Sequence, residues 1–316
     1  MTKKLLITFG CSWTFGMSIN YLPGMSKDEL QKTNENVTDT ANKLSFRGLL
    51  SAKYNFTNKN FASGASSNQR QFRLAKNFFQ SSDFARCKLE YDKIIVLWGI
   101  TSTARYEMFN VLTNQLSNFF LTHKSLMSEA LIKYSYNHNH EVWLLSQEMS
   151  HWNHYFNLLG IENFWFDTFN HHDYNQCTPA AEFYKDSYDS VKGIDWPSWQ
   201  QYITQNFGEN QMVQDEMLDS SRFEFASLIN TSPISNLLFP DHTPRDLMSQ
   251  MAILHGLNNF VQQYHTSDWK NDGDRVTHLV KNNLLNPISY HPTKTGHACI
   301  SDLLDKQIGH VFAADT

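Results

Sequence analysis

The strongest constraint on the fold comes from two short, mostly apolar runs that each end at a glycine. They cover residues 5–9, followed by Gly10, and residues 94–98, followed by Gly99. Runs of this length that stop at a turn residue are typical of strands buried on both faces of a parallel sheet. We therefore expect both runs to be core strands of such a sheet.

Weaker strand and helix patterns alternate with these two runs. Further strands are predicted at residues 54–61 and 163–168, and helices are predicted at residues 40–53, 66–80 and 146–159. Strands that alternate with helices indicate a parallel sheet with helices on both faces. The predicted fold class is therefore α/β, as a three-layer α/β/α arrangement.

The remaining residues are interpreted as an elaboration of the same domain. After residue 98 the pattern is helical to about residue 135, residues 171–285 suggest loops around short helices, and a final helix begins at Thr295 and Gly296. We predict one domain over residues 1–316. Its core is expected in residues 1–105, 160–170 and 286–316, with a long, mostly helical insertion over residues 106–285.

Composition narrows the classes of function. The 26 Lys and Arg against 31 Asp and Glu give a formal net charge of −5, which excludes a strongly basic nucleic-acid surface. The longest purely apolar run, residues 94–98, is far shorter than the roughly 20 residues of a membrane-spanning helix. The apolar run near the N-terminus is too short for a secretory signal, and the four cysteines form no CxxC pair. We expect reduced thiols, a cytoplasmic location, and neither a membrane span nor a nucleic-acid partner; the oligomeric state stays open.

Three segments carry residues suited to chemistry at places where a strand ends and a helix begins. The first, residues 10–16, follows the first strand and contains Ser12. A serine on such a turn lies beside backbone N–H groups that are free to face an oxyanion. A plain strand-to-loop turn with a small polar residue explains the same pattern.

The second and third segments follow the second strand and precede the last helix. In residues 60–68, Gly64 lacks a Cβ, so its N–H can approach a ligand closely, although Ser66 or Ser67 also suits the role of a helix cap. Residues 291–297 begin with His291, a residue type that serves as a general base near neutral pH. A histidine there equally fits a surface or core position.

Taken in order, these segments resemble the sequence blocks of the SGNH hydrolases, also called GDSL esterases and lipases. Residues 6–16 are similar to the first block, in which Gly-Asp-Ser is followed by another glycine, and residues 60–64 resemble the second. Residues 94–101 stand where the third block is expected, and residues 291–297 are similar to the last block, which carries the histidine. The resemblance implies a flavodoxin-like parallel sheet and ester hydrolysis.

The resemblance also implies roles for individual residues. Ser12 would be the nucleophile and His291 its general base, since a serine hydroxyl is a weak nucleophile until a base removes its proton. The N–H groups of Ser12 and Gly64 would bind the oxyanion. The implied substrate is an O-acyl or O-acetyl ester of a small molecule or carbohydrate, with no metal and no cofactor. Acyl transfer to another alcohol would use the same residues.

The sequence departs from the family pattern at three positions. Thr101 stands where the third block has an oxyanion-binding Asn, Ile288 where the last block has an Asp, and Cys11 where the first block has an Asp. Loss of one oxyanion donor costs about 10²–10³ in rate. These departures favour an alternative in which the chain binds a ligand or partner without catalysis.

Other residues suit the roles that these departures leave open. Asn68 and Thr101 are candidate oxyanion donors, although the threonine hydroxyl reaches less far than an amide. Arg105, with Glu107 nearby, is a candidate partner for a substrate carboxylate or phosphate, unless both residues cap a helix and face solvent. Trp13 is predicted to contact substrate as well. Cys11 is a weaker candidate nucleophile than the serine beside it, because its side chain is expected to point to the opposite face.

Overall fold

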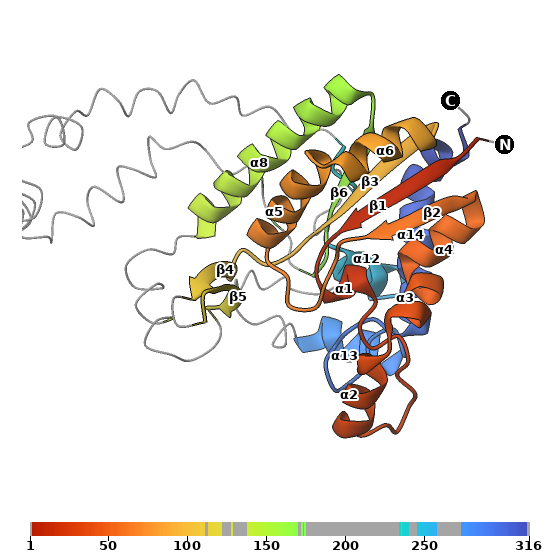
Figure 1. The fold of residues 1–316 in the computed structure, drawn as a ribbon. Helices are drawn as coiled ribbons and strands as arrows, with labels where there is room; N and C mark the ends of the chain where they lie inside the picture. Colours follow the sequence, from red (N-terminus) through yellow and green to blue (C-terminus); the bar gives the residue numbers. More distant parts are fainter. Residues whose placement is uncertain are drawn as a thin grey trace, which may run out of the picture.

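In the computed structural model, four strands of the described chain form one parallel sheet (Figure 1). The structure describes residues 2–110, 113–121, 138–169, 236–239, 245–257 and 273–314, together with Ser128, His172, Tyr174 and Ile234. In spatial order the strands are β2 (Phe56–Asn60), β1 (Lys4–Phe9), β3 (Lys93–Ile100) and β6 (Glu162–Asp167). An isolated parallel bridge joins Trp165 of β6 to Leu237. The predicted α/β class with a parallel sheet is confirmed.

The central strand β3 is buried along all eight residues, as its apolar sequence requires. Its side chains alternate between two apolar clusters because successive residues of a strand point to opposite faces. Ile95 and Leu97 face one cluster, and Val96 and Trp98 face the other. The sheet therefore carries a packed core on each side.

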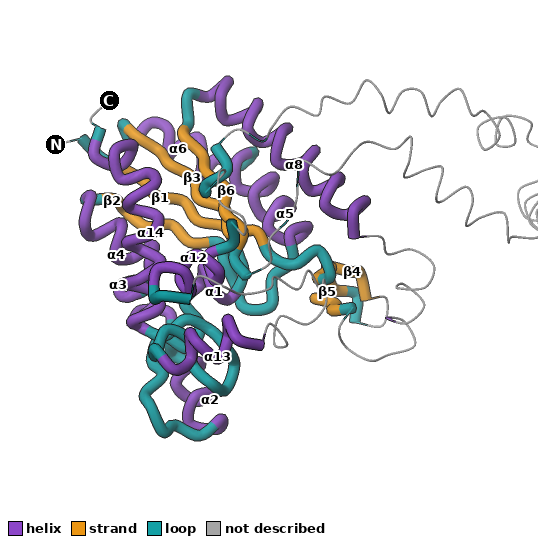
Figure 2. Tube along the Cα trace, turned by 180° about the vertical axis from the view of Figure 1, so that it is seen from behind, coloured by secondary structure: helices purple, strands orange, loops and turns teal. Residues whose placement is uncertain are grey.

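Helices cover both of these faces (Figures 1 and 2). On the face of Ile95 lie α4 (Phe46–Tyr54), α12 (Leu247–Leu254), α13 (Gly273–Lys281) and α14 (Lys294–Ala313). On the face of Trp98 lie α5 (Asn68–Phe79), α6 (Ser82–Glu90) and α8 (His138–Leu159). The helices that the sequence predicted at residues 66–80 and 146–159 correspond to α5 and to the C-terminal part of α8.

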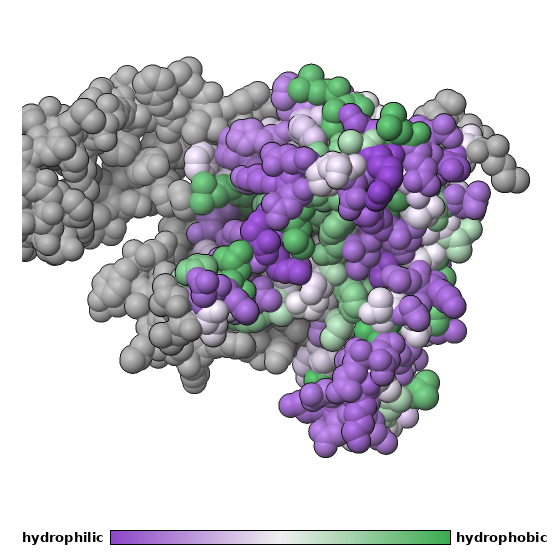
Figure 3. Space-filling view, viewed as in Figure 1, coloured by the Kyte–Doolittle hydropathy of each residue, from purple (hydrophilic) through white to green (hydrophobic). Residues whose placement is uncertain are grey.

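The helix predicted at residues 40–53 is two helices. α3 (Thr38–Leu44) ends and α4 begins at Ser45, whose backbone is extended at φ −69° and ψ 162°. The helix α2 (Lys27–Glu35) was not predicted, although Ser26 and Glu29 form a capping box at its start. α2 is largely polar, and its surface is hydrophilic in the space-filling view (Figure 3).

The helical interpretation of residues 99–135 was wrong where the structure describes them. β4 (Arg105–Asn110) and β5 (Gln115–Phe120) form an antiparallel pair in which Tyr106 lies opposite Phe119. Aromatic residues favour such cross-strand pairs, and Asn114 takes the positive φ of 52° that tight turns need. The expectation for residues 171–285 lies mostly outside the described residues. Among the described helices, none is long and apolar enough to span a membrane.

The packing of α14 against the chain that precedes it gives a stability test at Gly296. A Cβ on Gly296 would overlap the backbone carbonyl oxygen of Leu284, which cannot move without shifting the turn that follows. We expect Gly296→Ala to lower the free energy of unfolding by about 1–3 kcal/mol in urea denaturation, the usual cost of overpacking. Gly64→Ala is the matched control, because the nearest atom to its Cβ would be the Met17 sulfur at 3.9 Å. Equal stability of the two variants would contradict this packing.

Candidate active site

Ser12 is the first residue of α1 (Ser12–Phe15), a short helix at the carboxyl end of β1. The turn into α1 is tight because the Thr14 side chain packs directly against two glycines. A Cβ on either Gly10 or Gly99 would overlap Thr14 Oγ1. The glycine after β1 and the glycine near the end of β3 therefore allow α1 to lie directly on the sheet edge.

His291 comes from the opposite end of the chain, yet its ring reaches Ser12. The distance between His291 Nε2 and Ser12 Oγ is 2.7 Å, which is a hydrogen bond. The turn before His291 is held by Asn286, whose side-chain N–H donates to the His291 carbonyl over 2.9 Å. The sequence prediction that Ser12 and His291 belong together is therefore matched by their placement.

The hydroxyl of Ser289 is the hydrogen-bond partner of the other imidazole nitrogen of His291. The Nδ1 atom of His291 lies 2.9 Å from Ser289 Oγ, and Ser289 Oγ donates to Asn286 Oδ1 over 3.1 Å. Because the hydroxyl proton of Ser289 is directed to Asn286, its oxygen accepts from Nδ1–H. This leaves Nε2 with a lone pair toward the Ser12 hydroxyl, the tautomer that a general base needs.

The orienting role of Ser289 was missed from the sequence. The family pattern points to position 288, where an Asp is expected and Ile288 stands. A hydroxyl two residues before the histidine was the signal available. Among the described residues, no carboxylate contacts the His291 ring.

The charge environment keeps this histidine neutral. Burial and, to a smaller extent, the positive charge of Arg105 lower the pKa of His291 to about 4, while a backbone contact from Ser289 acts in the opposite direction. At neutral pH the ring is therefore unprotonated and able to accept a proton from Ser12.

Two backbone N–H groups are available beside Ser12. The Ser63 N–H donates to the Gly10 carbonyl over 3.3 Å, which ties the loop carrying Gly64 to the turn carrying Ser12. Within the described chain, neither the Ser12 N–H nor the Gly64 N–H donates a hydrogen bond. Both are the donors that the sequence analysis assigned to the oxyanion.

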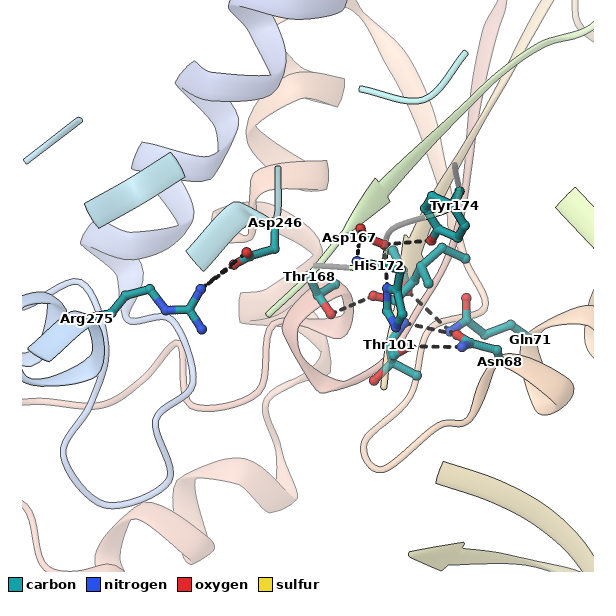
Figure 4. Close-up of polar contacts among 11 residues, drawn as sticks. Asn68, Gln71, Thr101, Asp167, Thr168, His172, Tyr174, Asp246 and Arg275 are labelled. Carbon is teal, nitrogen blue, oxygen red and sulfur yellow. Dashed lines mark hydrogen bonds and ion pairs between the residues drawn. The ribbon is translucent and has the colours of Figure 1, made fainter. Parts of the chain in front are cut away.

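Asn68 and Thr101 interact with each other (Figure 4). Asn68 Nδ2 donates to the Thr101 carbonyl over 2.9 Å, and Asn68 Oδ1 accepts from the Thr101 N–H over 3.0 Å. The amide thus braces the end of β3, which limits its freedom to serve as an oxyanion donor. The buried Thr101 hydroxyl has no hydrogen-bond partner among the described residues.

The predicted substrate contacts differ in their placement. Trp13 is only 1% exposed and packs in the core against Phe169, so its ring has almost no surface to offer a substrate. Arg105 lies over the rings of Phe120 and Phe169, at 5.5 Å and 4.9 Å from their centroids. Glu107 does not accompany it, because both Glu107 oxygens accept from Arg73 at 2.6 Å. Arg105 begins a strand, which also excludes the helix-capping interpretation.

Cys11, the alternative nucleophile, is fully buried and belongs to the apolar cluster on the α14 side of the sheet. The serine beside it is the residue that bonds His291. This arrangement favours Ser12 over Cys11 as nucleophile.

A buried polar cluster that the sequence analysis missed lies at the end of β6 (Figure 4). Asp167 accepts from Tyr174 OH over 2.8 Å and lies 2.9 Å from His172 Nδ1. Burial alone would raise the pKa of Asp167, but the charge and hydrogen bonds of His172 and the bond from Tyr174 outweigh it and lower that pKa. The cluster fixes the chain that leaves β6. Among the described residues, no three potential metal ligands gather at one place.

No protein-family model, curated protein or solved structure matches this chain. The pairing of Ser12 with His291, and the groups around that pair, therefore carry the functional assignment.

The low pKa values of the buried histidines give a test that needs no substrate. Burial lowers the pKa of His291 to about 4 and that of fully buried His297 to about 3, from an ordinary value of 6.5. Below pH 6.5 the unfolded chain binds protons that the folded chain refuses, so the free energy of unfolding should fall as the pH drops from 6.5 toward 4. Imidazole NMR titration of the folded protein checks the two pKa values, and urea unfolding at pH 7 and pH 5 checks the direction. An ordinary pKa near 6.5 for His291 would contradict the environment described.

Proposed function

We propose that this chain is a serine-dependent ester hydrolase of the SGNH type, acting on an O-acyl or O-acetyl ester through an acyl-enzyme. The observation that carries the proposal is the 2.7 Å hydrogen bond between Ser12 Oγ and the Nε2 atom of His291. The tautomer fixed by Ser289 supports it, because it presents a lone pair to the serine proton.

In the proposed reaction His291 takes the Ser12 proton while Ser12 Oγ attacks the acyl carbon. The N–H groups of Ser12 and Gly64 stabilise the negative charge that develops on the carbonyl oxygen. The imidazolium of His291 then gives its proton to the leaving alcohol. Water, deprotonated by His291, attacks the acyl-enzyme; the bond from the acyl carbon to Ser12 Oγ then breaks, and the imidazolium gives its proton to Ser12 Oγ as the acid leaves.

The order of the strands supports the finer fold proposal, a three-layer, flavodoxin-like α/β/α domain. The order β2-β1-β3-β6, with the Leu237 bridge beyond β6, agrees with the doubly wound order 2-1-3-4-5. Ligands of such sheets bind outside the carboxyl ends of the strands. Ser12 and Thr101 follow β1 and β3 at that edge.

The proposed reaction is expected to be less efficient than that of a Ser-His-Asp triad, because a hydroxyl, that of Ser289, takes the place of the carboxylate. Ser289 orients the ring of His291, but it brings no negative charge to stabilise the imidazolium that forms during the reaction. This weakness is what favours the alternative, binding of a ligand without turnover. Transfer of the acyl group to an alcohol other than water uses the same residues.

An activity-based label separates these functions. We expect a fluorophosphonate probe to label the folded protein, and we expect labelling to vanish in Ser12→Ala and to fall by at least about 10³ in His291→Ala, as when a serine loses its base. Mass spectrometry of the labelled peptide should place the adduct on Ser12. Cys11→Ala is the control and should still be labelled. Folded wild-type protein that remains unlabelled would support binding without catalysis.

Ser289 has its own test as a positioning residue. We expect Ser289→Ala to lower kcat of the best ester substrate by about 10–10² with little change in KM, because the proton transfer, not binding, depends on ring orientation. Ser289→Asp should restore part of kcat and raise the pKa of His291, since a carboxylate favours the imidazolium. Ser18→Ala is the matched control: its hydroxyl also lies 3.2 Å from Ser289 Oγ but does not contact the ring. Equal losses in Ser18→Ala and Ser289→Ala would contradict this role.

A further inference from the structure

Arg105 places a positive charge beside the catalytic pair. Its guanidinium lies over the faces of Phe120 and Phe169 and next to the Cys11 thiol, the residue before Ser12. Its charge also acts on His291. The aromatic faces fix the plane of the guanidinium, so its N–H groups point in directions that the protein determines.

This charge has no anionic partner among the described residues. Its Nη1 group is buried and donates no hydrogen bond, and no carboxylate forms an ion pair with it. Two buried arginines differ: Arg47 donates to backbone carbonyls, and Arg275 pairs with Asp246. A buried guanidinium N–H without an acceptor calls for a bound group to satisfy it.

Arg105 also lines a pocket of about 540 Å³ whose other walls come from α5 and α8. Asn68 and Thr103 line it near the end of β3, and Phe72 and Trp143 give it aromatic walls. The pocket therefore joins an apolar surface to the one positively charged guanidinium in its lining, the combination typical of small-molecule sites.

The charges around this pocket limit the anion that it accepts. Glu141 and Glu148 also line it, and Glu148 pairs with Lys76 at its rim over 3.3 Å. His151 is the remaining titratable group in the lining. Two glutamates disfavour a doubly charged phosphate, whereas one guanidinium matches one carboxylate in charge and in geometry.

We propose that the ester substrate carries a single carboxylate, which pairs with Arg105, and an aromatic or apolar body, which lies in the pocket between α5 and α8. This inference rests on the proposed ester hydrolysis at Ser12 and names the class of substrate.

The test compares three acetyl esters of meta-substituted phenols that differ in the charge of the substituent: 3-acetoxybenzoate, its methyl ester and 3-acetoxyphenyl phosphate. We expect wild-type kcat/KM for 3-acetoxybenzoate to exceed that for the neutral methyl ester by at least about 10-fold, as a charge-assisted hydrogen bond provides, and also to exceed that for the phosphate. Arg105→Gln should bring the carboxylate-to-methyl-ester ratio near one; the ratio is the readout because the loss of the Arg105 charge also changes the pKa of His291 and therefore the rate with both esters. Arg86→Gln is the matched control, since it removes one surface charge on α6 that pairs with Asp83, and it should keep the wild-type ratio.

A binding experiment without turnover separates the two proposals. In calorimetry, Ser12→Ala should bind 3-hydroxybenzoate at least about 10-fold more tightly than it binds methyl 3-hydroxybenzoate. Adding Arg105→Gln to this variant should weaken the binding of 3-hydroxybenzoate by the same factor. If binding depends on Arg105 but the protein hydrolyses none of the esters, the result would contradict the proposed esterase activity and support the proposed carboxylate site. If charged and neutral esters are bound equally well and hydrolysed at equal rates, the result would contradict the proposed carboxylate site and support the proposed esterase activity. Preference for the phosphate would also contradict the carboxylate site.

Discussion

The hydrogen bond between Ser12 and His291 joins residues that are 279 positions apart, so both of its ends must be held by other contacts. At the serine end the decisive residue is Arg47 of α4. Its guanidinium donates to the carbonyls of Thr14 and Phe15, at 3.3 Å and 3.1 Å, where α1 ends. A cation at the C-terminus of a helix satisfies carbonyls that the helix itself leaves open. Burial lowers the pKa of Arg47 to about 10, yet the group remains charged at neutral pH and ties α1 to α4.

At the histidine end a single amide organises the turn. Asn286 Oδ1 accepts from the N–H groups of Ile288 and Ser289, at 3.1 Å and 2.8 Å, and from the Ser289 hydroxyl. The turn holds Tyr290 at a φ of 54°, which a bulky side chain adopts only when its surroundings impose it. Strain directly before His291 is therefore stabilised by the same residue that directs the Ser289 proton. Position and tautomer of the ring depend on one side chain.

The sequence predicted the structure well where burial alone determines it, and poorly where it depends on contacts with a partner strand or side chain. The strands at residues 5–9 and 94–98 were predictable because a parallel strand covered on both faces has few other residue choices. The pairing of Ser12 with His291 was expected from the resemblance to the SGNH sequence blocks, which have a serine after the first strand and a histidine before the last helix. The β4–β5 pair was not, because short aromatic segments favour a strand only once a partner strand lies beside them. Ser289 was not found because a hydroxyl orients an imidazole only when a third group, here Asn286, takes its proton.

The absence of a carboxylate on His291, among the residues described, and the charge on Arg105 have a common consequence. The hydroxyl of Ser289 brings no negative charge to the ring of His291, while burial and, to a smaller extent, the Arg105 guanidinium lower the pKa of that ring. His291 is therefore a well-oriented base with a lowered pKa. A carboxylate bound to Arg105 would cancel the guanidinium charge near the ring and so raise the pKa of His291 toward the range where proton transfer is efficient. The substrate would then supply the negative charge that an aspartate supplies in a Ser-His-Asp triad. Under the proposed function, binding of the substrate carboxylate and activation of His291 would be one electrostatic event, and esters that carry a carboxylate would react faster than neutral ones.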